Sequence, residues 1–202
     1  MGSIINSIKW QNGVIMYNNQ VYLNLSELDA TAQTLAFYKH LGLSYPKFYK
    51  MDLPSKVAYL CAELIVQKAQ DAAITWHEDK VAMLCSTATG SLDVDEKYLA
   101  TCETIPSPAL FVYTLPNIML GEVCIRHKFK GEQLCTIAAK IQTEFSYHYI
   151  QDLFANRQQD FCLVAEVAAY QQHIDAKMAL IAKEKLPNSS NFSFEYFNAI
   201  FN

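Results

Sequence analysis

The residues that could do chemistry in this sequence are few and scattered. The six cysteines form no Cys-x-x-Cys or Cys-His pair: Cys61, Cys85, Cys102, Cys124, Cys135 and Cys162. Most lie in apolar runs such as VAMLCST and DFCLVAEV, which is typical of buried, reduced thiols in a cytosolic protein. A metal site would need clustered ligands, and the sequence has none. We therefore expect no bound metal.

Other catalytic signatures are also missing from the sequence, among them the G-x-S-x-G elbow, the P-loop and G-x-G-x-x-G. Asp93 and Asp95 have the spacing of an acid-base or cation pair. Such residues are more often the N-cap and first-turn charges of a helix. Glu122 and Arg126 lie four residues apart and are expected to form an ion pair on a helix surface.

Length and composition indicate a folded protein. The chain has 202 residues, 51% of them apolar and 18% charged, and a net charge of −4. A disordered chain would carry more charge and fewer aromatic residues. A nucleic-acid surface is not expected without a basic stripe. No apolar run reaches the ~20 residues of a membrane span, and MGSIINSIKW has no signal-peptide pattern. We expect a cytoplasmic protein.

Periodicity and chain breaks predict alternating strands and helices. The strongest helix signal is residues 52–70, where Asp52 is a plausible N-cap and apolar residues recur every three to four positions. The segment KVAMLCST is continuously apolar, as in a strand buried on both faces. The expected strands are 3–9, 19–25, 80–87, 134–139 and 160–169, and the expected helices are 26–40, 52–70, 94–104, 143–158 and 174–185.

This alternation predicts an α/β fold with a mostly parallel sheet and helices on both faces. Neither a long linker nor a repeat divides the sequence, so we expect residues 1–202 to form a single domain. The tail 187–202 is polar but carries five aromatic residues. It is expected to dock on the domain or to be partly flexible.

Four segments in order resemble the N-terminal half of β-ketoacyl-acyl carrier protein synthases, members of the thiolase-like superfamily. They are FYKMDLPSKVAYLCAELIV, VAMLCSTATGSLDVDEKY, PSPALFVYTLPNIMLGEVCIRHKFKGE and DFCLVAEVAAY. Together they cover about residues 45–170. The chain is most similar to the short ketosynthase-like proteins of aryl-polyene and flexirubin-type pigment pathways. The resemblance implies a thiolase-like half-domain with a sheet of about five strands and no cofactor.

The resemblance also implies where a nucleophile should lie. The family's cysteine follows the lysine-glycine pair by roughly nine residues and stands at a helix N-terminus, where the helix dipole favours a thiolate. Counted from Gly131, that position is close to Lys140, and no cysteine occurs there. Cys135 comes several residues earlier, on the expected strand, and Gln142 comes two residues later. Glutamine replaces the cysteine in decarboxylating and chain-length-factor relatives.

The segment before this position carries the other residues that the resemblance singles out. Pro116 and Asn117 would begin a helix whose small residue Gly121 allows close packing near the dimer and active-site region. Gly131 would turn the chain into the strand that delivers the nucleophile. Taken without the resemblance, the same residues could simply begin and end a helix of any α/β domain.

The basic catalytic groups of the family are a second feature that this sequence lacks. In the family they lie in the other half of a duplicated fold, and the histidines of this sequence match none of their positions: His40, His77, His127, His148 and His173. His127 ends the expected Pro-Asn helix, where a cation suits the dipole. Half of a duplicated fold would leave an apolar helical layer exposed, so we expect a partner to cover it, or the aromatic tail to fold back over it.

These observations favour a non-catalytic, ketosynthase-like accessory protein in an acyl-carrier-protein-dependent pathway. It would form a homodimer, or a heterodimer with a ketosynthase-like chain, and could help to hold a carrier protein. The alternative is an enzyme, an acyltransferase, decarboxylase or thioesterase-like activity that uses Lys140, Cys135 or a residue of a partner chain. A binding domain unrelated to acyl metabolism stays open as well, because a fold does not fix a function.

Overall fold

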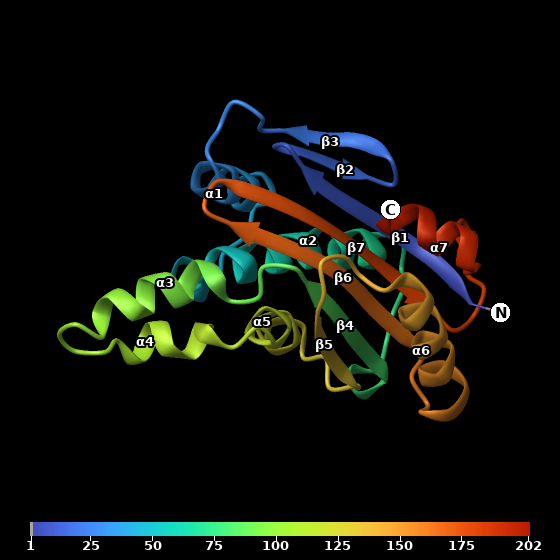
Figure 1. The fold of residues 1–202 in the computed structure, drawn as a ribbon. Helices are drawn as coiled ribbons and strands as arrows, with labels where there is room; N and C mark the ends of the chain where they lie inside the picture. The colour runs from blue at the N-terminus through green and yellow to red at the C-terminus, as the bar shows by residue number, and fades with distance from the viewer. Residues whose placement is uncertain (1) are drawn as a thin grey trace.

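The computed structural model describes residues 2–202, which form one mixed sheet with helices on both faces (Figure 1). The strands are β1 Ser3–Gln11, β2 Val14–Tyr17, β3 Gln20–Asn24, β4 Val81–Thr87, β5 Gln133–Ile137, β6 Phe161–Tyr170, β7 His173–Ala182 and β8 Ser190–Asn191. The α-helices are α1 Ala30–His40, α2 Leu53–Asp71, α3 Leu92–Thr101, α4 Pro108–Phe111, α5 Ile118–His127, α6 Thr143–Asn156 and α7 Phe194–Phe201. Short 3-10 helices are η1 Pro46–Lys50, η2 Glu78–Lys80 and η3 Val112–Thr114.

The sheet differs from the expected one in size and direction. It has 8 strands in the order β3-β2-β1-β7-β6-β4-β5, with β8 paired to β1. Only the pairs of β4 with β5 and with β6 are parallel, and the remaining pairs are antiparallel. The prediction of a mostly parallel sheet of about five strands is therefore wrong. The prediction of helices on both faces is confirmed.

The prediction of a helix at residues 174–185 is wrong. The predicted helix there is strand β7, which turns back from β6 through the two residues Gln171 and Gln172. Gln171 has a φ of 54°, a conformation that glycine or asparagine usually supplies in such turns. Burial of almost every residue of β7 outweighs the helical preference of its alanine, lysine, methionine and leucine residues.

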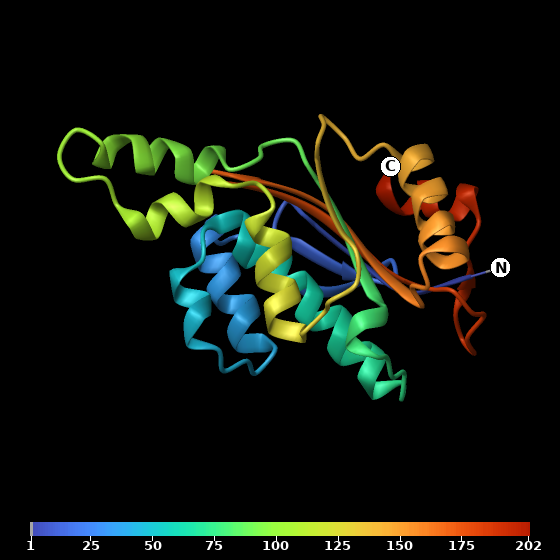
Figure 2. The ribbon, with the colours of Figure 1, turned by 90° about the horizontal axis from the view of Figure 1, so that it is seen from below.

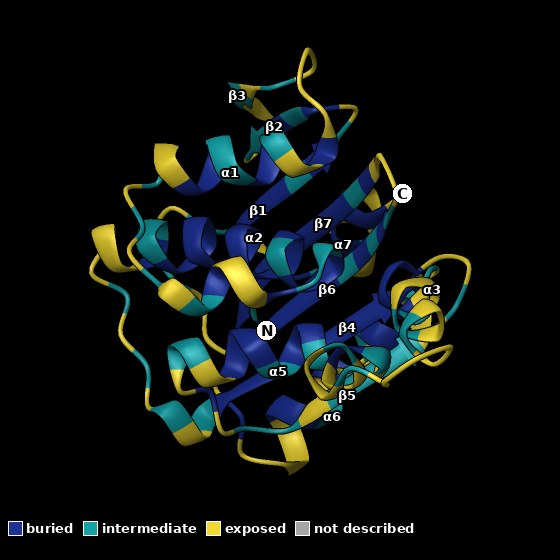
Figure 3. Ribbon diagram, turned by 90° about the vertical axis from the view of Figure 1, so that its left-hand side faces the viewer, coloured by how far each residue is buried: buried dark blue, intermediate teal, exposed yellow. Residues whose placement is uncertain are grey.

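The first face of the sheet is covered by α1, α2 and α5 (Figure 2). Asp52 caps α2 as predicted, accepting a hydrogen bond from the Ser55 amide. Helix α2 is buried along most of its length, because it lies between the sheet and the helices α1 and α5 (Figure 3). Two stacked aromatic pairs pack in this layer. The ring centroids of Tyr45 and Tyr59 are 5.6 Å apart, and those of Tyr38 and Phe48 are 4.2 Å apart.

The second face is covered by α6 and by the C-terminal helix α7, which lie side by side (Figures 1 and 2). Phe197, Ile200 and Phe201 of α7 are buried against β7 and α6. The aromatic tail is thus part of the core on this face. It covers sheet surface that would otherwise be open, as the sequence reading allowed.

Gly131→Ala is expected to lower the free energy of unfolding by roughly 1–3 kcal/mol. A Cβ atom at residue 131 would lie 2.6 Å from the carbonyl carbon of Val81 and against the Gln159 side chain. Chemical denaturation measures the effect.

Gly121→Ala is the matched control for this variant. A Cβ atom at residue 121 meets nothing within 4 Å, and alanine is favoured over glycine inside a helix by about 0.5–1 kcal/mol. Equal losses of stability in the two variants would contradict the close approach at Gly131.

Candidate functional site

The candidate site is the loop 138–142, which joins the end of β5 to the start of α6. Two backbone amides tie this loop to the sheet. The Ala138 amide donates to the carbonyl of Thr87 at 3.1 Å, and the Ile141 amide donates to Oε1 of Glu166 at 2.7 Å. Thr87 ends β4 and Glu166 lies within β6, so two central strands position the loop.

A buried ion pair holds Glu166 in place. Lys177 lies directly opposite Glu166 on β7, and its Nζ is 3.2 Å from Glu166 Oε2. The same ammonium group donates to the carbonyl of Phe201, at the end of α7, at 2.7 Å. Thr143 Oγ1 donates to Asn198 Oδ1 at 2.7 Å. The start of α6 and helix α7 are therefore fixed by one connected polar network.

The three predicted nucleophile candidates lie in different surroundings. Gln142 directly precedes Thr143, the first residue of α6, but its side chain is exposed and makes no capping hydrogen bond. Lys140 is exposed in the loop, two residues earlier. Cys135 lies in the middle of β5, half-buried. Only Gln142 therefore stands at the helix N-terminus, where the dipole would stabilise an anion.

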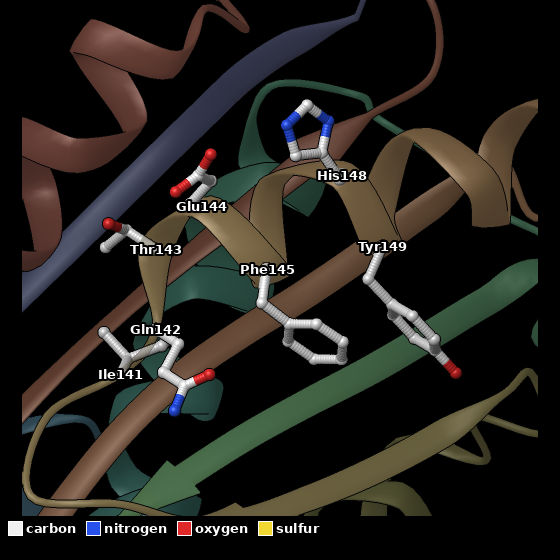
Figure 4. A pocket seen from close by; sticks show the side chains of 7 residues that line it. All are labelled: Ile141, Gln142, Thr143, Glu144, Phe145, His148 and Tyr149. Atoms are coloured by element: carbon white, nitrogen blue, oxygen red, sulfur yellow. The ribbon is translucent and has the colours of Figure 1, made fainter.

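An open depression of about 780 Å³ surrounds the start of α6. Its lining residues all come from the loop and the first two turns of the helix: Ile141, Gln142, Thr143, Glu144, Phe145, His148 and Tyr149 (Figure 4). Phe145 and Tyr149 project from one side of α6, with ring centroids 5.6 Å apart, and Glu144 and His148 project from the other. A site built from one helix and its loop is a surface hollow, suited to contact with another molecule.

The space beneath α6 is nearly filled. Between α6 and strands β4 and β5, the gap lined by Leu84, Cys85, Ile141 and Phe145 among others has a volume of about 10 Å³. This is about the minimum for one water molecule. An acyl chain would not fit into this gap in the present conformation.

The remaining predicted residues lie around α5. Asn117 precedes α5, but its side chain makes no capping hydrogen bond. Pro116 lies two residues before the helix, 3.6 Å from the position of a Cβ atom on Gly90. Gly121 contacts no other element of the described chain closely, whereas Gly131 lies against the backbone of Val81. Gly131 therefore packs closely within the chain, whereas the surface of α5 at Gly121 is open.

The two aspartates with acid-base spacing lie in the first turn of α3. Asp93 accepts from Lys97 Nζ at 2.7 Å, and Asp95 accepts from Ser91 Oγ at 2.9 Å. Each carboxylate has a local helix partner, which is the arrangement expected of first-turn charges.

The predicted surface pair of Glu122 with Arg126 is wrong. Glu122 is buried, accepts from the Tyr113 hydroxyl at 2.9 Å and lies 2.7 Å from Lys47 Nζ. Arg126 Nε donates instead to the buried Glu63 of α2 at 2.6 Å. The reason is that α5 packs along α2, so this side of α5 faces protein. A glutamate in the apolar run CAELIV was the available sequence signal for Glu63.

His127 also differs from expectation. It ends α5, where a cation would suit the helix dipole, but its side chain is only 9% exposed. Burial lowers the pKa of His127 to about 4, with Glu63 opposing and Arg126 adding to the shift. The imidazole is therefore neutral near pH 7.

Residues 92–115 form an arm that projects from the sheet, built from α3, α4 and η3 (Figure 1). Its outer surface is largely exposed (Figure 3). Several large apolar side chains of the arm face solvent: Leu92, Leu99, Ile105, Phe111, Val112 and Leu115. Such clusters often mark protein-protein contact sites.

The described residues lack two kinds of feature. Within residues 2–202, no group of three or more His, Cys, Asp or Glu side chains could hold a metal ion. No single helix in this range is long and apolar enough to cross a membrane. The segments Pro108–Thr114 and Ile118–His127 pass that test only as a pair, across a bend of 98°.

No protein-family model and no curated protein matches this sequence. Solved structures do match. The ishigamide ketosynthase/chain length factor aligns with a TM-score of 0.69 at 12% identity, over 93% of this chain and 63% of that chain. The ketosynthase ApeO in complex with its chain length factor ApeC, from Xenorhabdus doucetiae, aligns with a TM-score of 0.56 at 12% identity, over 90% and 79%. The complex AntDE:AntF, a type II polyketide synthase acyl-carrier protein with its ketosynthase, aligns with a TM-score of 0.61 at 8% identity. The alignment covers 90% of this chain and 62% of that chain.

This chain has a thiolase-like, ketosynthase-type fold. The chain spans less than two thirds of the length of two of these three proteins. At the candidate site, strand β5 leads through the loop 138–142 into the N-terminus of α6. In this chain the helix N-terminus carries Gln142.

The buried His127 is expected to make stability fall as pH is lowered. Its pKa is about 4 in the folded protein and about 6.5 in an unfolded chain. Between these values the unfolded state binds more protons, so the contribution of His127 is complete above pH 6.5 and is lost progressively toward pH 4. The loss amounts to about 3 kcal/mol at most.

Denaturation at a series of pH values checks this, with His127→Gln expected to flatten the dependence. His148→Gln is the matched control, because His148 is exposed. A wild-type protein whose stability does not change between pH 7 and pH 4.5 would contradict a buried neutral imidazole.

Proposed function

We propose that this chain is a non-catalytic, ketosynthase-like partner protein in acyl-carrier-protein-dependent fatty acid or polyketide biosynthesis. One observation carries the proposal: the N-terminus of α6, where a ketosynthase would hold its nucleophile, carries Gln142 and no thiol. Condensation requires a thiolate that accepts the acyl group. The nearest thiol, Cys135, lies on a strand, away from any helix dipole.

The surroundings of the loop support the same proposal. Decarboxylation of a malonyl group needs donors that stabilise the developing enolate. The histidine closest to the loop, His148, projects from the side of α6 opposite Phe145 and bonds to Gln151 at 3.2 Å. The gap of about 10 Å³ beneath α6 leaves no room for an acyl chain. An acyl chain would have to lie outside this gap, for instance in the hollow of about 270 Å³ between the end of β5 and the start of α6.

Two surfaces are available for that partner. Strand β5 is the last strand of the sheet order and pairs with β4 alone among the described strands. An unpaired strand edge is a template for pairing with another chain, and Ile137 and Phe145 beside it are 68% and 46% exposed. The apolar arm 92–115 is the second surface. Gly121 lies on the open side of α5, where a partner chain could also approach the helix backbone closely.

The named similarities support a ketosynthase-like chain as the partner. Two of the matched structures pair a ketosynthase with a chain length factor, and the third holds a ketosynthase with an acyl-carrier protein. A homodimer would use the same two surfaces. We also propose that the protein acts in the cytoplasm, where acyl carrier proteins and reduced thiols are found.

One observation favours the alternative, an enzyme with a displaced nucleophile. The neighbouring Cys85 thiol lowers the pKa of Cys135 below its ordinary value. A thiolate at Cys135 could accept an acyl group, and Lys140 could do so as an exposed amine. A partner chain would have to supply the remaining catalytic groups.

Incubation with short acyl-CoA and acyl-carrier thioesters, followed by intact-protein mass spectrometry, separates the two functions. We expect no stable acyl adduct on the wild-type chain, and the same result for Cys135→Ala and Lys140→Ala. An adduct that disappears in one of these variants would identify an enzyme and overturn the non-catalytic assignment.

A substitution in the arm tests the partner surface. Leu99→Asp, at a side chain that is 70% exposed, is expected to reduce association with itself or with a co-expressed ketosynthase at least tenfold, because a charge in an apolar contact is costly. Size-exclusion chromatography with light scattering gives the readout. Val21→Asp, at 66% exposure on β3, is the matched control. Loss of association in both variants, or in neither, would contradict a contact through the arm.

A further inference from the structure

Two cysteines lie side by side on the parallel strands at the edge of the sheet. Cys85 of β4 and Cys135 of β5 are direct register partners. In parallel strands, register partners project from the same face. The Cys85 sulfur also lies 3.6 Å from the Met119 sulfur of α5. Both cysteine side chains therefore project from the face of the sheet on which Cys85 meets α5.

The two thiols differ in the ways that matter for reactivity. Cys135 is half-buried on the outermost strand, whereas Cys85 is 2% exposed. The neighbouring Cys85 thiol lowers the pKa of Cys135, and the Cys135 thiol together with burial raises the pKa of Cys85 well above its usual range. A half-buried thiol whose pKa is lowered thus lies beside a buried thiol whose pKa is raised, an arrangement that suits an attacking and a resolving cysteine.

We propose that Cys135 and Cys85 form an oxidation site, at which a hydroperoxide converts the two thiols into an intramolecular disulfide. In the first step the Cys135 thiolate attacks a peroxide oxygen; an S–O bond forms, the O–O bond breaks and hydroxide leaves. In the second step the Cys85 sulfur attacks the sulfenic sulfur of Cys135. An S–S bond replaces the S–O bond, and water leaves with the Cys85 proton. The thiols lose two electrons, which the peroxide gains.

The strand geometry permits this bond. Neighbouring strands are separated by about 4.8 Å, within the range of about 4.4–6.8 Å that Cα atoms of a disulfide span. Because β5 pairs only with β4 among the described strands, it can adjust toward β4 without breaking a second ladder. The disulfide would fasten the edge strand just before the loop 138–142.

The other cysteines lack the combination of a partly exposed thiol and a second thiol beside it. Cys61 and Cys162 are buried, and burial raises the pKa of each thiol. Cys124 is buried beside the Met83 sulfur, 3.9 Å away, and its pKa is raised to about 12. Cys102 is exposed, but its sulfur bonds only to the Tyr98 carbonyl. Oxidation should therefore be selective for one pair.

The test treats the full chain with hydrogen peroxide and follows it by intact mass and peptide mapping. The wild-type mass is expected to fall by about 2 Da, with a Cys85–Cys135 peptide. Cys135→Ser should lose thiols about tenfold more slowly. In Cys85→Ser, the Cys135 sulfenic acid should persist and be trapped by dimedone. Cys102→Ser is the control and should form the same disulfide as the wild type.

Several outcomes would overturn the proposal. They are a disulfide between two chains or between other cysteines, conversion of wild-type Cys135 directly to the sulfinic acid, and equal rates in wild type and Cys135→Ser. Thermal unfolding of each variant verifies that it is folded, and Cys85→Ala replaces Cys85→Ser if serine is not tolerated in the core. Acyl transfer is not involved, so the outcome does not depend on the proposed function.

Discussion

The ion pair of Lys177 with Glu166 is the interaction on which the candidate site depends. Two charges that are 10% and 12% exposed would be costly to bury without partners. Their remaining hydrogen bonds go to the Ile141 amide and the Phe201 carbonyl. A helix start and a helix end are therefore held on opposite sides of one salt bridge. Replacing either residue alone would leave the other charge unpaired and remove the bond to one of the two segments: Ile141 for Glu166, and Phe201 for Lys177.

Much of the fold could be predicted from local patterns, and the failures have specific causes. Helix α2 and strand β4 carry strong signals, a capped apolar periodicity and an unbroken apolar run, and both lie where expected. Strand β7 carries helix-forming residues and follows a turn of two glutamines, so nothing in the sequence identifies the hairpin. The antiparallel directions depend on this hairpin and on pairings between residues more than 150 positions apart. Local patterns do not encode such pairings.

The candidate site could be predicted less well than the fold. The sequence pointed to the segment around Lys140 and to the absence of a cysteine there, and counting from Gly131 favoured Lys140. The position of the helix start, which depends on packing of α6 on the sheet, makes Gln142 the terminal residue instead. Glu166 and Lys177 were missed, because a glutamate in an apolar strand and a lysine in an expected helix give no sign that they meet.

The strand order has a consequence for how the chain can fold during synthesis. The meander β1–β3, within residues 3–24, joins the rest of the sheet only through β7, which ends at residue 182. Strands β4, β5 and β6 can pair before β7 has left the ribosome, but the meander has no sheet to join until then. Strand β7, with 10 residues, pairs with β1 on one side and with β6 on the other, and so joins the two parts of the sheet. Such late, long-range closure makes folding slow and leaves an apolar sheet edge exposed in the nascent chain, where chaperones would bind.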